Sequence, residues 1–298
     1  MNIPKQQHWV PRFYLRFFST PETAESDEPK VWLLSKDEGD PMLTNTRKVA
    51  TQNYLYSPKD ERGIRDPKME KRLGDCETLL SQIWPLLAAD FVDLHADESI
   101  RKGLALFVSL LFLRHPKQIR AQRNIQKQLV EMFDSFPKDR NGNPDVSEVE
   151  HRGIIREFDS SDWNTFKDAS PEKLKKMFVT SIRSEAVRLA EILMKKRWSV
   201  VFADQPVFIT TDAPVMMLNQ TRERFGFGTP GTVVSFPLSP TRILMMDDQH
   251  DQPAARYYPL ADTGPGFANG LAWRNCERFM ISPRHPDQVC AEILATAA

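Results

Sequence analysis

The sequence predicts an α+β fold in which a helical middle segment packs against a small mixed or antiparallel sheet. Two observations lead to this prediction. Short β-rich runs occur near the start of the chain and again after Trp198, whereas residues 66–197 carry apolar side chains at helical spacing. We expect one domain over residues 1–298, built from an N-terminal β-containing segment (1–60), the helical block (66–197) and a β-rich closing segment (198–298). The N-terminal strand is expected to join the C-terminal sheet.

The helical block has clear start signals. A first helix is expected from Asp66 and Pro67, and Asp97 can cap the next one, which carries the apolar run "GLALFVSLLFL". Pro116 suits the first turn of a more polar helix. "PKDRNGNPD" (137–145) is the strongest loop signal, and Ser170 begins a last long helix. The apolar stripe of that helix is Leu174, Phe178, Ile182, Ala186, Leu189 and Leu193.

The two ends of the chain supply the strands. "KVWLLSK" (30–36) reads as a strand in the N-terminal segment. In the closing segment, strands are expected at "WSVVFAD", "PVFITTD", "TVVSFPLS", "RILMMDD" and "RFMIS". "ANGLAWRNC" and "HPDQVCAEILATAA" are expected to be helices on either side of the last strand.

Composition limits the classes of function. Forty basic and forty acidic residues give a formal net charge of +0, so no global field draws the chain to nucleic acid or to an anionic membrane, and any anion site must be local. The three cysteines form no C-x-x-C motif, which favours a reducing compartment. The start "MNIPKQQHW" lacks the apolar region of a signal peptide, and the longest apolar run is well short of the roughly 20 residues of a membrane span. We therefore expect a cytoplasmic protein without a membrane association.

The opening stretch "QHWVPRFYLRFFS" (7–19) combines cations with aromatic residues. His8, Arg12 and Arg16 share one stripe in a helix and one face in a strand. The residues of the aromatic face are Trp9, Phe13 and Phe17. Arginine binds phosphate or carboxylate in a bidentate manner, and histidine can transfer a proton near neutral pH. Alternatively, the aromatic residues pin the N-terminus while the arginines bond carbonyls or acidic partners at the surface.

Two further stretches carry candidate residues. "FITTDAPV" (208–215) places Asp212 at a strand exit, where a carboxylate serves as a metal ligand or general base, or else makes an Asx-turn before Pro214. "LRHPKQIRAQR" (113–123) places Arg114 directly after the buried run, where it binds phosphate or lies on a solvated face. If Arg114 points inward, it needs a partner.

Four stretches together resemble a bacterial family catalogued as domain of unknown function 4238. They are "QHWVPRFYLRFF", "FLRHPKQ", "FITTDAPV" and "FPLSPTRIL", and the resemblance covers essentially the whole chain. Its pattern has a His-x-x-Pro-x-x-Tyr-Leu opening and a Thr-x-Asp-x-Pro strand exit. The positions that match are His8, Pro11, Tyr14, Leu15, Arg16, Arg114, Pro116, Asp212 and Pro214. Arg12 departs from the pattern, which usually has a neutral polar residue there. The family is uncharacterised, so the resemblance implies no reaction, but it suggests that His8, Arg16, Arg114 and Asp212 converge at one cleft.

Three hypotheses follow. The first is an enzyme acting on a phosphate-bearing substrate, with a nuclease or phosphodiesterase as the best guess: His8 is the acid or base and Asp212 orients it or binds a divalent metal such as Mg²⁺. Arg16, Arg114 and Tyr14 then hold a phosphate-bearing small molecule or a short single-stranded nucleic acid. The second is a non-catalytic anion- or partner-binding sensor module in a bacterial stress or defence response. The third is a buried structural network that joins the N-terminus to the sheet. The oligomeric state is left open.

Overall fold

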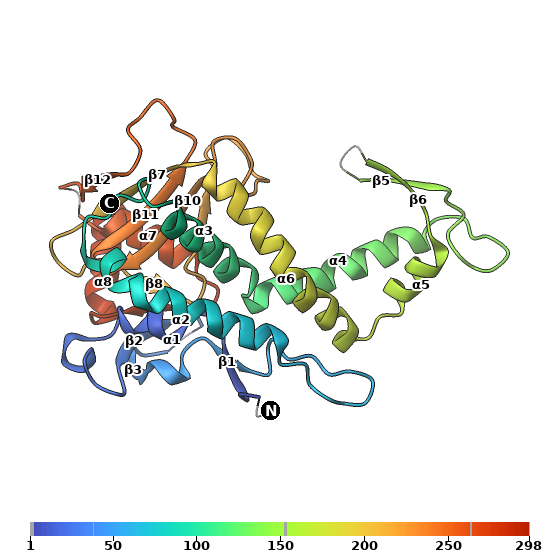
Figure 1. The fold of residues 1–298 in the computed structure, drawn as a ribbon, viewed down its shortest axis with the longest axis horizontal. Coiled ribbons are helices and arrows are strands. Elements are labelled where there is room, and N and C mark those ends of the chain that lie inside the picture. Colours follow the sequence, from blue (N-terminus) through green and yellow to red (C-terminus); the bar gives the residue numbers. More distant parts are fainter. Residues whose placement is uncertain (1–2, 38, 152–153, 263, 298) are drawn as a thin grey trace.

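The computed structural model describes residues 3–37, 39–151, 154–262 and 264–297, and its fold is α+β as predicted. Helices occupy the middle of the chain and strands lie at both ends (Figure 1). The strands at the two ends of the chain form a body with α2 (Lys68–Ala89), α3 (Glu98–Leu113), α7 (Gly266–Asn275) and α8 (Pro286–Ala297), and α4 (Pro116–Asp134) and α6 (Pro171–Met194) project from it as an arm (Figure 1).

The expected joining of the N-terminal strand to the C-terminal strands is confirmed. One sheet has the order β3-β2-β13-β8 and is antiparallel throughout. Its strands are β2 (Lys30–Ser35), β3 (Met42–Asn45), β8 (Thr210–Thr211) and β13 (Phe279–Ser282). The pairing of β2 with β13 brings residues about 250 positions apart into register, with Leu33 opposite Ile281. The N-terminal segment therefore completes a sheet that the closing segment cannot form alone.

A second sheet has the order β12-β7-β11-β10-β9 and is mixed, because β12 runs parallel to β7. Its strands are β7 (Arg197–Phe202), β9 (Met216–Leu218), β10 (Val233–Ser239), β11 (Arg242–Asp247) and β12 (Arg256–Pro259). A separate two-stranded pair joins β1 (Gln6–His8) to β4 (Thr51–Asn53). Thr210 and Thr211 thus lie at the edge of one sheet, and the chain enters the other at Met216.

The helices begin where the capping residues indicate. The helices of the middle block are α2 (Lys68–Ala89), α3 (Glu98–Leu113), α4 (Pro116–Asp134), α5 (Ser160–Lys167) and α6 (Pro171–Met194). Asp97 accepts hydrogen bonds from the first-turn amides of α3, and Ser170 accepts one from α6. The whole predicted stripe of α6 is buried. Among the described residues, no helix combines the length and apolar composition needed to cross a bilayer.

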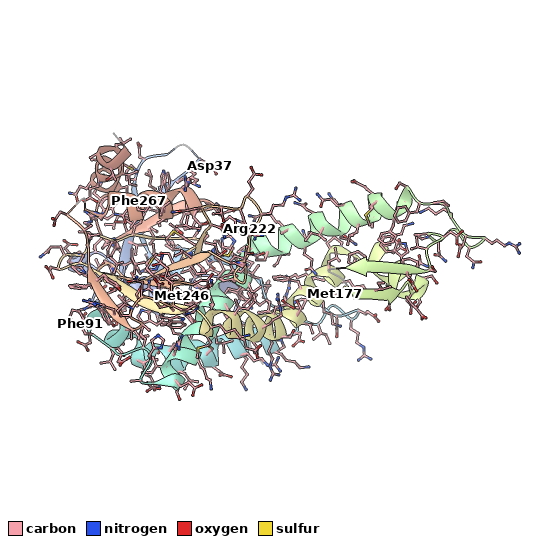
Figure 2. All side chains as sticks on the ribbon, turned by 90° about the horizontal axis from the view of Figure 1, so that it is seen from above. Asp37, Phe91, Met177, Arg222, Met246 and Phe267 are labelled. Atoms are coloured by element: carbon pink, nitrogen blue, oxygen red, sulfur yellow. The ribbon has the colours of Figure 1, made fainter. Side chains whose placement is uncertain are left out.

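The arm contains a feature that the helical prediction for residues 66–197 missed. A hairpin of β5 (Glu148–His151) and β6 (Ile154–Glu157) lies near its tip, beside α5 (Figure 1). Figure 2 shows the same projection from above. Phe133 of α4, Phe158 and Trp163 of α5 pack together there, with ring centroids of Phe133 and Trp163 4.5 Å apart. The tip therefore has a small aromatic cluster of its own.

The main core draws on all three regions of the sequence, and the short helix α1 (Arg12–Arg16) contributes to it. Tyr14 and Leu15 on α1 are fully buried. At the end of the body opposite the arm, α7 (Gly266–Asn275) packs on α8 (Pro286–Ala297) (Figure 1). A Cβ atom at Gly266 would lie 2.3 Å from the main-chain oxygen of Glu292, so this close contact requires glycine.

Candidate functional site

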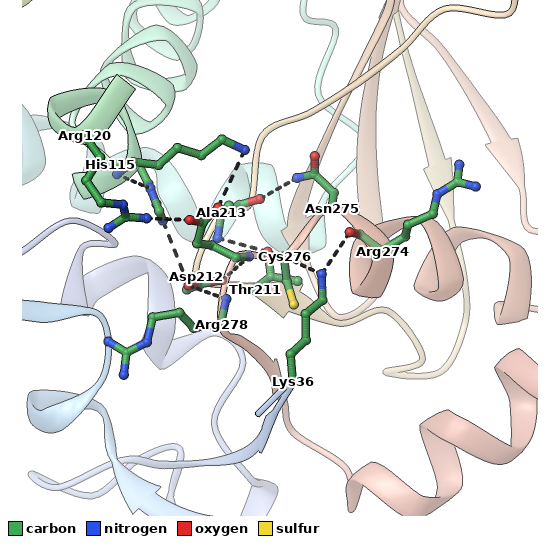
Figure 3. A network of polar contacts seen from close by, with 12 residues as sticks. Lys36, His115, Arg120, Thr211, Asp212, Ala213, Arg274, Asn275, Cys276 and Arg278 are labelled. Atoms are coloured by element: carbon green, nitrogen blue, oxygen red, sulfur yellow. Dashed lines mark hydrogen bonds and ion pairs between the residues drawn. The ribbon is translucent and has the colours of Figure 1, made fainter. Parts of the chain in front are cut away.

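Asp212 is held by main-chain amides from a distant loop. It follows β8 directly, and its carboxylate is completely buried. Oδ1 accepts a hydrogen bond from the Glu277 amide and Oδ2 one from the Arg278 amide, both at 3.0 Å (Figure 3). The local turn is made instead by Thr211, whose hydroxyl accepts from the Ala213 amide at 3.1 Å. Asp212 therefore fixes the loop before β13 and does not form the Asx-turn that was the alternative.

Tyr14 connects the opening stretch to the same strand. Its hydroxyl lies 2.7 Å from Thr210 Oγ1 and donates to the Pro237 carbonyl at 2.8 Å. Burial raises the pKa of this phenol far above its ordinary value, so Tyr14 stays neutral. It was expected to contact substrate, but the structure places it inside the core with its hydroxyl bonded to protein atoms.

Arg114 also points inward. The side chain is 3 % exposed, and Nη1 pairs with Glu77 Oε1 at 2.7 Å. Nη2 donates to the main-chain carbonyl of His8. The Arg114 carbonyl in turn accepts a 2.5 Å hydrogen bond from the Tyr56 hydroxyl. Both terminal nitrogens of the buried guanidinium thus have protein partners, whereas Nε has none among the described residues, and the bond to His8 ties β1 to the junction of α3 and α4.

His8 is neutral at pH 7. Its Nε2 lies 3.1 Å from the Arg47 carbonyl, which can only accept, so the ring donates there. Burial lowers the pKa of His8 to about 4, and the charges of Arg12 and Arg114 act in the same direction. A base with so low a pKa is a weak proton acceptor for catalysis near neutral pH.

The five predicted site residues do not share one cleft lined by their side chains. Arg16 is exposed at the end of α1, whereas Tyr14, Arg114 and Asp212 are buried. Within the described residues, no hydrogen bond or ion pair joins the side chains of His8 and Asp212. The link between them runs through neighbours: the Trp9 indole donates to the Asp212 carbonyl at 2.9 Å. These contacts fit the third hypothesis, a buried network between the N-terminus and the sheet.

His115 is the residue that the sequence reasoning undervalued. It is the N-cap of α4, and its Nδ1 accepts from the Lys117 amide at 3.0 Å. The neutral ring therefore carries its proton on Nε2, which lies 4.0 Å from Asp212 Oδ2 and has no hydrogen-bond partner among the described residues. The Trp9 ring meets the His115 ring edge-on, 5.8 Å between centroids. The sequence signal for this position is the proline that follows, because Pro116 at the first helical position makes His115 the N-cap.

A pocket of about 540 Å³ opens beside His115. It lies between the junction of α3 and α4 on one side and the chain after Asp212 on the other. Its lining residues are Leu111, Phe112, His115, Lys117, Gln118, Ala213, Pro214, Val215, Met217, Glu223, Arg224, Phe225 and Asn275. The walls are mainly apolar, and none of the five predicted site residues lines them.

Two cations and one carboxylate line this pocket: Lys117, Arg224 and Glu223. Lys117 lies on the first turn of α4, where the helix dipole also favours negative charge. Arg224 lines the same pocket from the segment before β10. Lys117 pairs with Glu277 at only 3.7 Å, with both side chains partly exposed, and the closer partner of Glu277 is Arg120. The ion pair of Lys117 with Glu277 is therefore weak, and the ammonium group of Lys117 can also bind a ligand.

A family model described as "Protein of unknown function (DUF4238)" matches residues 6–297. The chain belongs to this family. The resemblance drawn from the sequence motifs is thereby confirmed. No curated protein and no solved structure matches the chain.

For this member of the DUF4238 family, the motif residues have an evident structural role. Tyr14 of the opening motif bonds Thr210 of the strand-exit motif, and Trp9 beside His8 bonds Asp212. In the described part of the chain, no group of three or more His, Cys, Asp or Glu side chains is placed to hold a metal ion. The expected dependence on a divalent metal such as Mg²⁺ stays a prediction.

Proposed function

We propose that the chain binds a small phosphate-bearing organic molecule in the pocket beside His115, and that it acts as a binding protein without turnover. The observation that carries the proposal is that Lys117, on the first turn of α4, and Arg224 line the same pocket, against the single carboxylate of Glu223. Apolar walls suit the body of an organic ligand, and the two cations with the helix terminus suit its phosphate.

The available histidines support binding over catalysis. A general base needs a free lone pair within reach of the substrate. The Nδ1 lone pair of His115 is used by the Lys117 amide, and Nε2 carries the proton of the neutral ring. His8 has a pKa of about 4 because of its burial, and it does not line this pocket. A role as nuclease or phosphodiesterase stays a prediction, as do a sensor role in a stress or defence response and a cytoplasmic location.

The size of the pocket indicates which probe to use. A volume of about 540 Å³ is within the range of sites for small organic ligands. Phe112 and Phe225 are the aromatic residues of the lining and offer ring surface to a flat ligand. Adenosine monophosphate therefore tests the proposal, and adenosine, which lacks the phosphate, isolates the contribution of the charge.

The experiment is a calorimetric titration of the full chain with both probes. We expect adenosine monophosphate to bind more tightly than adenosine, and Lys117→Met to weaken only the phosphate-bearing probe, by about five- to tenfold. Lys127→Met is the matched control, because Lys127 is exposed on the same helix and does not line the pocket. Equal binding of the two probes, or equal effects of the two variants, would contradict the proposal.

Turnover is tested on the same samples. A phosphodiester such as bis(4-nitrophenyl) phosphate is incubated with the chain, with Mg²⁺ or with chelator, and product is followed by absorbance. We expect no release above the uncatalysed rate. Release that His8→Ala abolishes in a folded variant would overturn the binding-only proposal and favour the enzyme hypothesis.

A further inference from the structure

Four exposed cations gather where α1 packs on the 3₁₀ helix η2 (Thr46–Lys48). They are Arg12 and Arg16 of α1 and Arg47 and Lys48 of η2. The two elements are also joined by the hydrogen bond between the His8 ring and the Arg47 carbonyl. We call the surface formed by these four residues the α1–η2 face.

The positions of the two arginines on α1 are fixed by the core. Tyr14 and Leu15 lie on the same short helix and are fully buried, so the helix cannot turn about its axis without exposing them. Arg12 and Arg16 are four residues apart and therefore lie one turn above the other. The face presents its charges from an anchored backbone, and only the side-chain ends are free to adjust.

The positive charge of this face is poorly compensated by the protein. The Arg47 guanidinium lies 3.7 Å from the Glu28 carboxylate, and both side chains are more than half exposed. Among the described residues, no carboxylate lies within 4.0 Å of the charged atoms of Arg12, Arg16 or Lys48. Burial and the nearby charge of Arg47 lower the pKa of Arg12. Two like charges held close to each other favour an anion that relieves their repulsion.

We propose that the α1–η2 face binds an oligophosphate group, that is, a chain of two or more linked phosphates. The site is separate from the pocket beside His115 and does not depend on the function proposed for it. The three guanidinium groups can each bind two phosphate oxygens at once. Balancing the charge of all four cations takes several negative charges on one compact ligand, which linked phosphates carry.

Other features of the face disfavour single-stranded nucleic acid. Such strands usually bind by stacking their bases on aromatic side chains next to a basic groove. Phe13 and Phe17, the aromatic residues of this stretch that are not fully buried, pack against the core. The formal net charge of +0 also gives the whole chain no long-range attraction for a polymeric anion.

The test is calorimetry at low ionic strength with sodium tripolyphosphate as the probe. We expect Arg12→Gln and Arg47→Gln each to weaken binding by about five- to tenfold, and the double variant by more than about thirtyfold. Arg140→Gln is the matched control, because Arg140 is an exposed arginine on the arm. Adenosine monophosphate, the probe for the pocket, should bind Arg12→Gln as tightly as it binds the natural chain, which separates this site from the pocket.

A second readout reports where the ligand binds. Tripolyphosphate next to Arg12 opposes the charge that Arg12 exerts on His8, so the pKa of His8, measured by NMR from its ring protons, should rise from about 4 on binding. Circular dichroism confirms that the variants are folded. The proposal is overturned if Arg140→Gln weakens binding as much as Arg12→Gln. It is likewise overturned if tripolyphosphate fails to bind, or if a twelve-nucleotide single strand binds more tightly through the same arginines.

Discussion

The indole of Trp9 donates a 2.9 Å hydrogen bond to the main-chain carbonyl of Asp212, across 203 residues of sequence. The carboxylate of Asp212 continues this connection to the amides of Glu277 and Arg278. One residue of the strand exit thus joins the N-terminal segment, β8 and the loop before β13. Because both the main chain and the buried side chain of Asp212 take part in this connection, we expect its loss to destabilise the fold.

Tyr14→Phe removes the hydroxyl that bonds Thr210 and Pro237 while keeping the aromatic ring in place. We expect a loss of about 1–3 kcal/mol in the free energy of unfolding, because a buried carbonyl loses its donor. Urea denaturation measures the change. Combining the variant with Thr210→Val in a double-mutant cycle isolates the bond between the two side chains. Additive effects of the two substitutions would show that the two hydroxyls do not interact.

Asp212→Asn replaces one carboxylate oxygen by an amide group that cannot accept a hydrogen bond. One of the two amides of Glu277 and Arg278 then loses its acceptor inside the protein. We expect destabilisation of about 2–4 kcal/mol in urea denaturation. Asp251→Asn, at an exposed position, serves as the control and should change stability by less than about 0.5 kcal/mol. Unchanged stability of the Asp212 variant would contradict this structural role.

His8 should make the protein less stable in acid. Its folded-state pKa of about 4 is below the ordinary 6.5, so the unfolded chain binds a proton between these values and the folded chain does not. Stability therefore falls as the pH is lowered from 6.5 towards 4, by about 2 kcal/mol once partial exposure is allowed for. His8→Gln should lose this part of the pH dependence. An NMR pKa of His8 near 6.5 would contradict the prediction.

Glu70 should have the opposite dependence on pH. Burial and then the nearby Glu77 raise its pKa to about 7, against the attraction of Arg114. Between pH 4.5 and 7 the unfolded chain has released this proton while the folded chain keeps it, so stability falls as the pH rises. Glu70→Gln should thus be more stable than the natural chain at pH 8, by about 1–2 kcal/mol, and gain little at pH 4.5. The exposed Glu131→Gln is the control and should show no such trend.

Local order along the chain could be read from the sequence. The start of α6 at Ser170, its buried stripe and the N-cap of α3 depend on spacing and capping within a few residues, which the sequence contains directly. The strand at residues 30–36 could be predicted for the same reason. The hairpin in the arm was missed, because its two strands are only four residues long and strand formation depends strongly on tertiary context.

The sequence by itself determined the α+β class, the starts of α3, α4 and α6, and the family to which the chain belongs, because these follow from local periodicity, capping residues and motif order. Only the tertiary structure determined which polar residues are buried and which partners they bind. Spacing put His8, Arg12 and Arg16 on one stripe, but only packing left Arg16 exposed while Arg114 was buried beside Glu77. A side chain's role depends on the partners that folding brings to it. The partner of Trp9 lies 203 residues away, beyond the range of any local pattern.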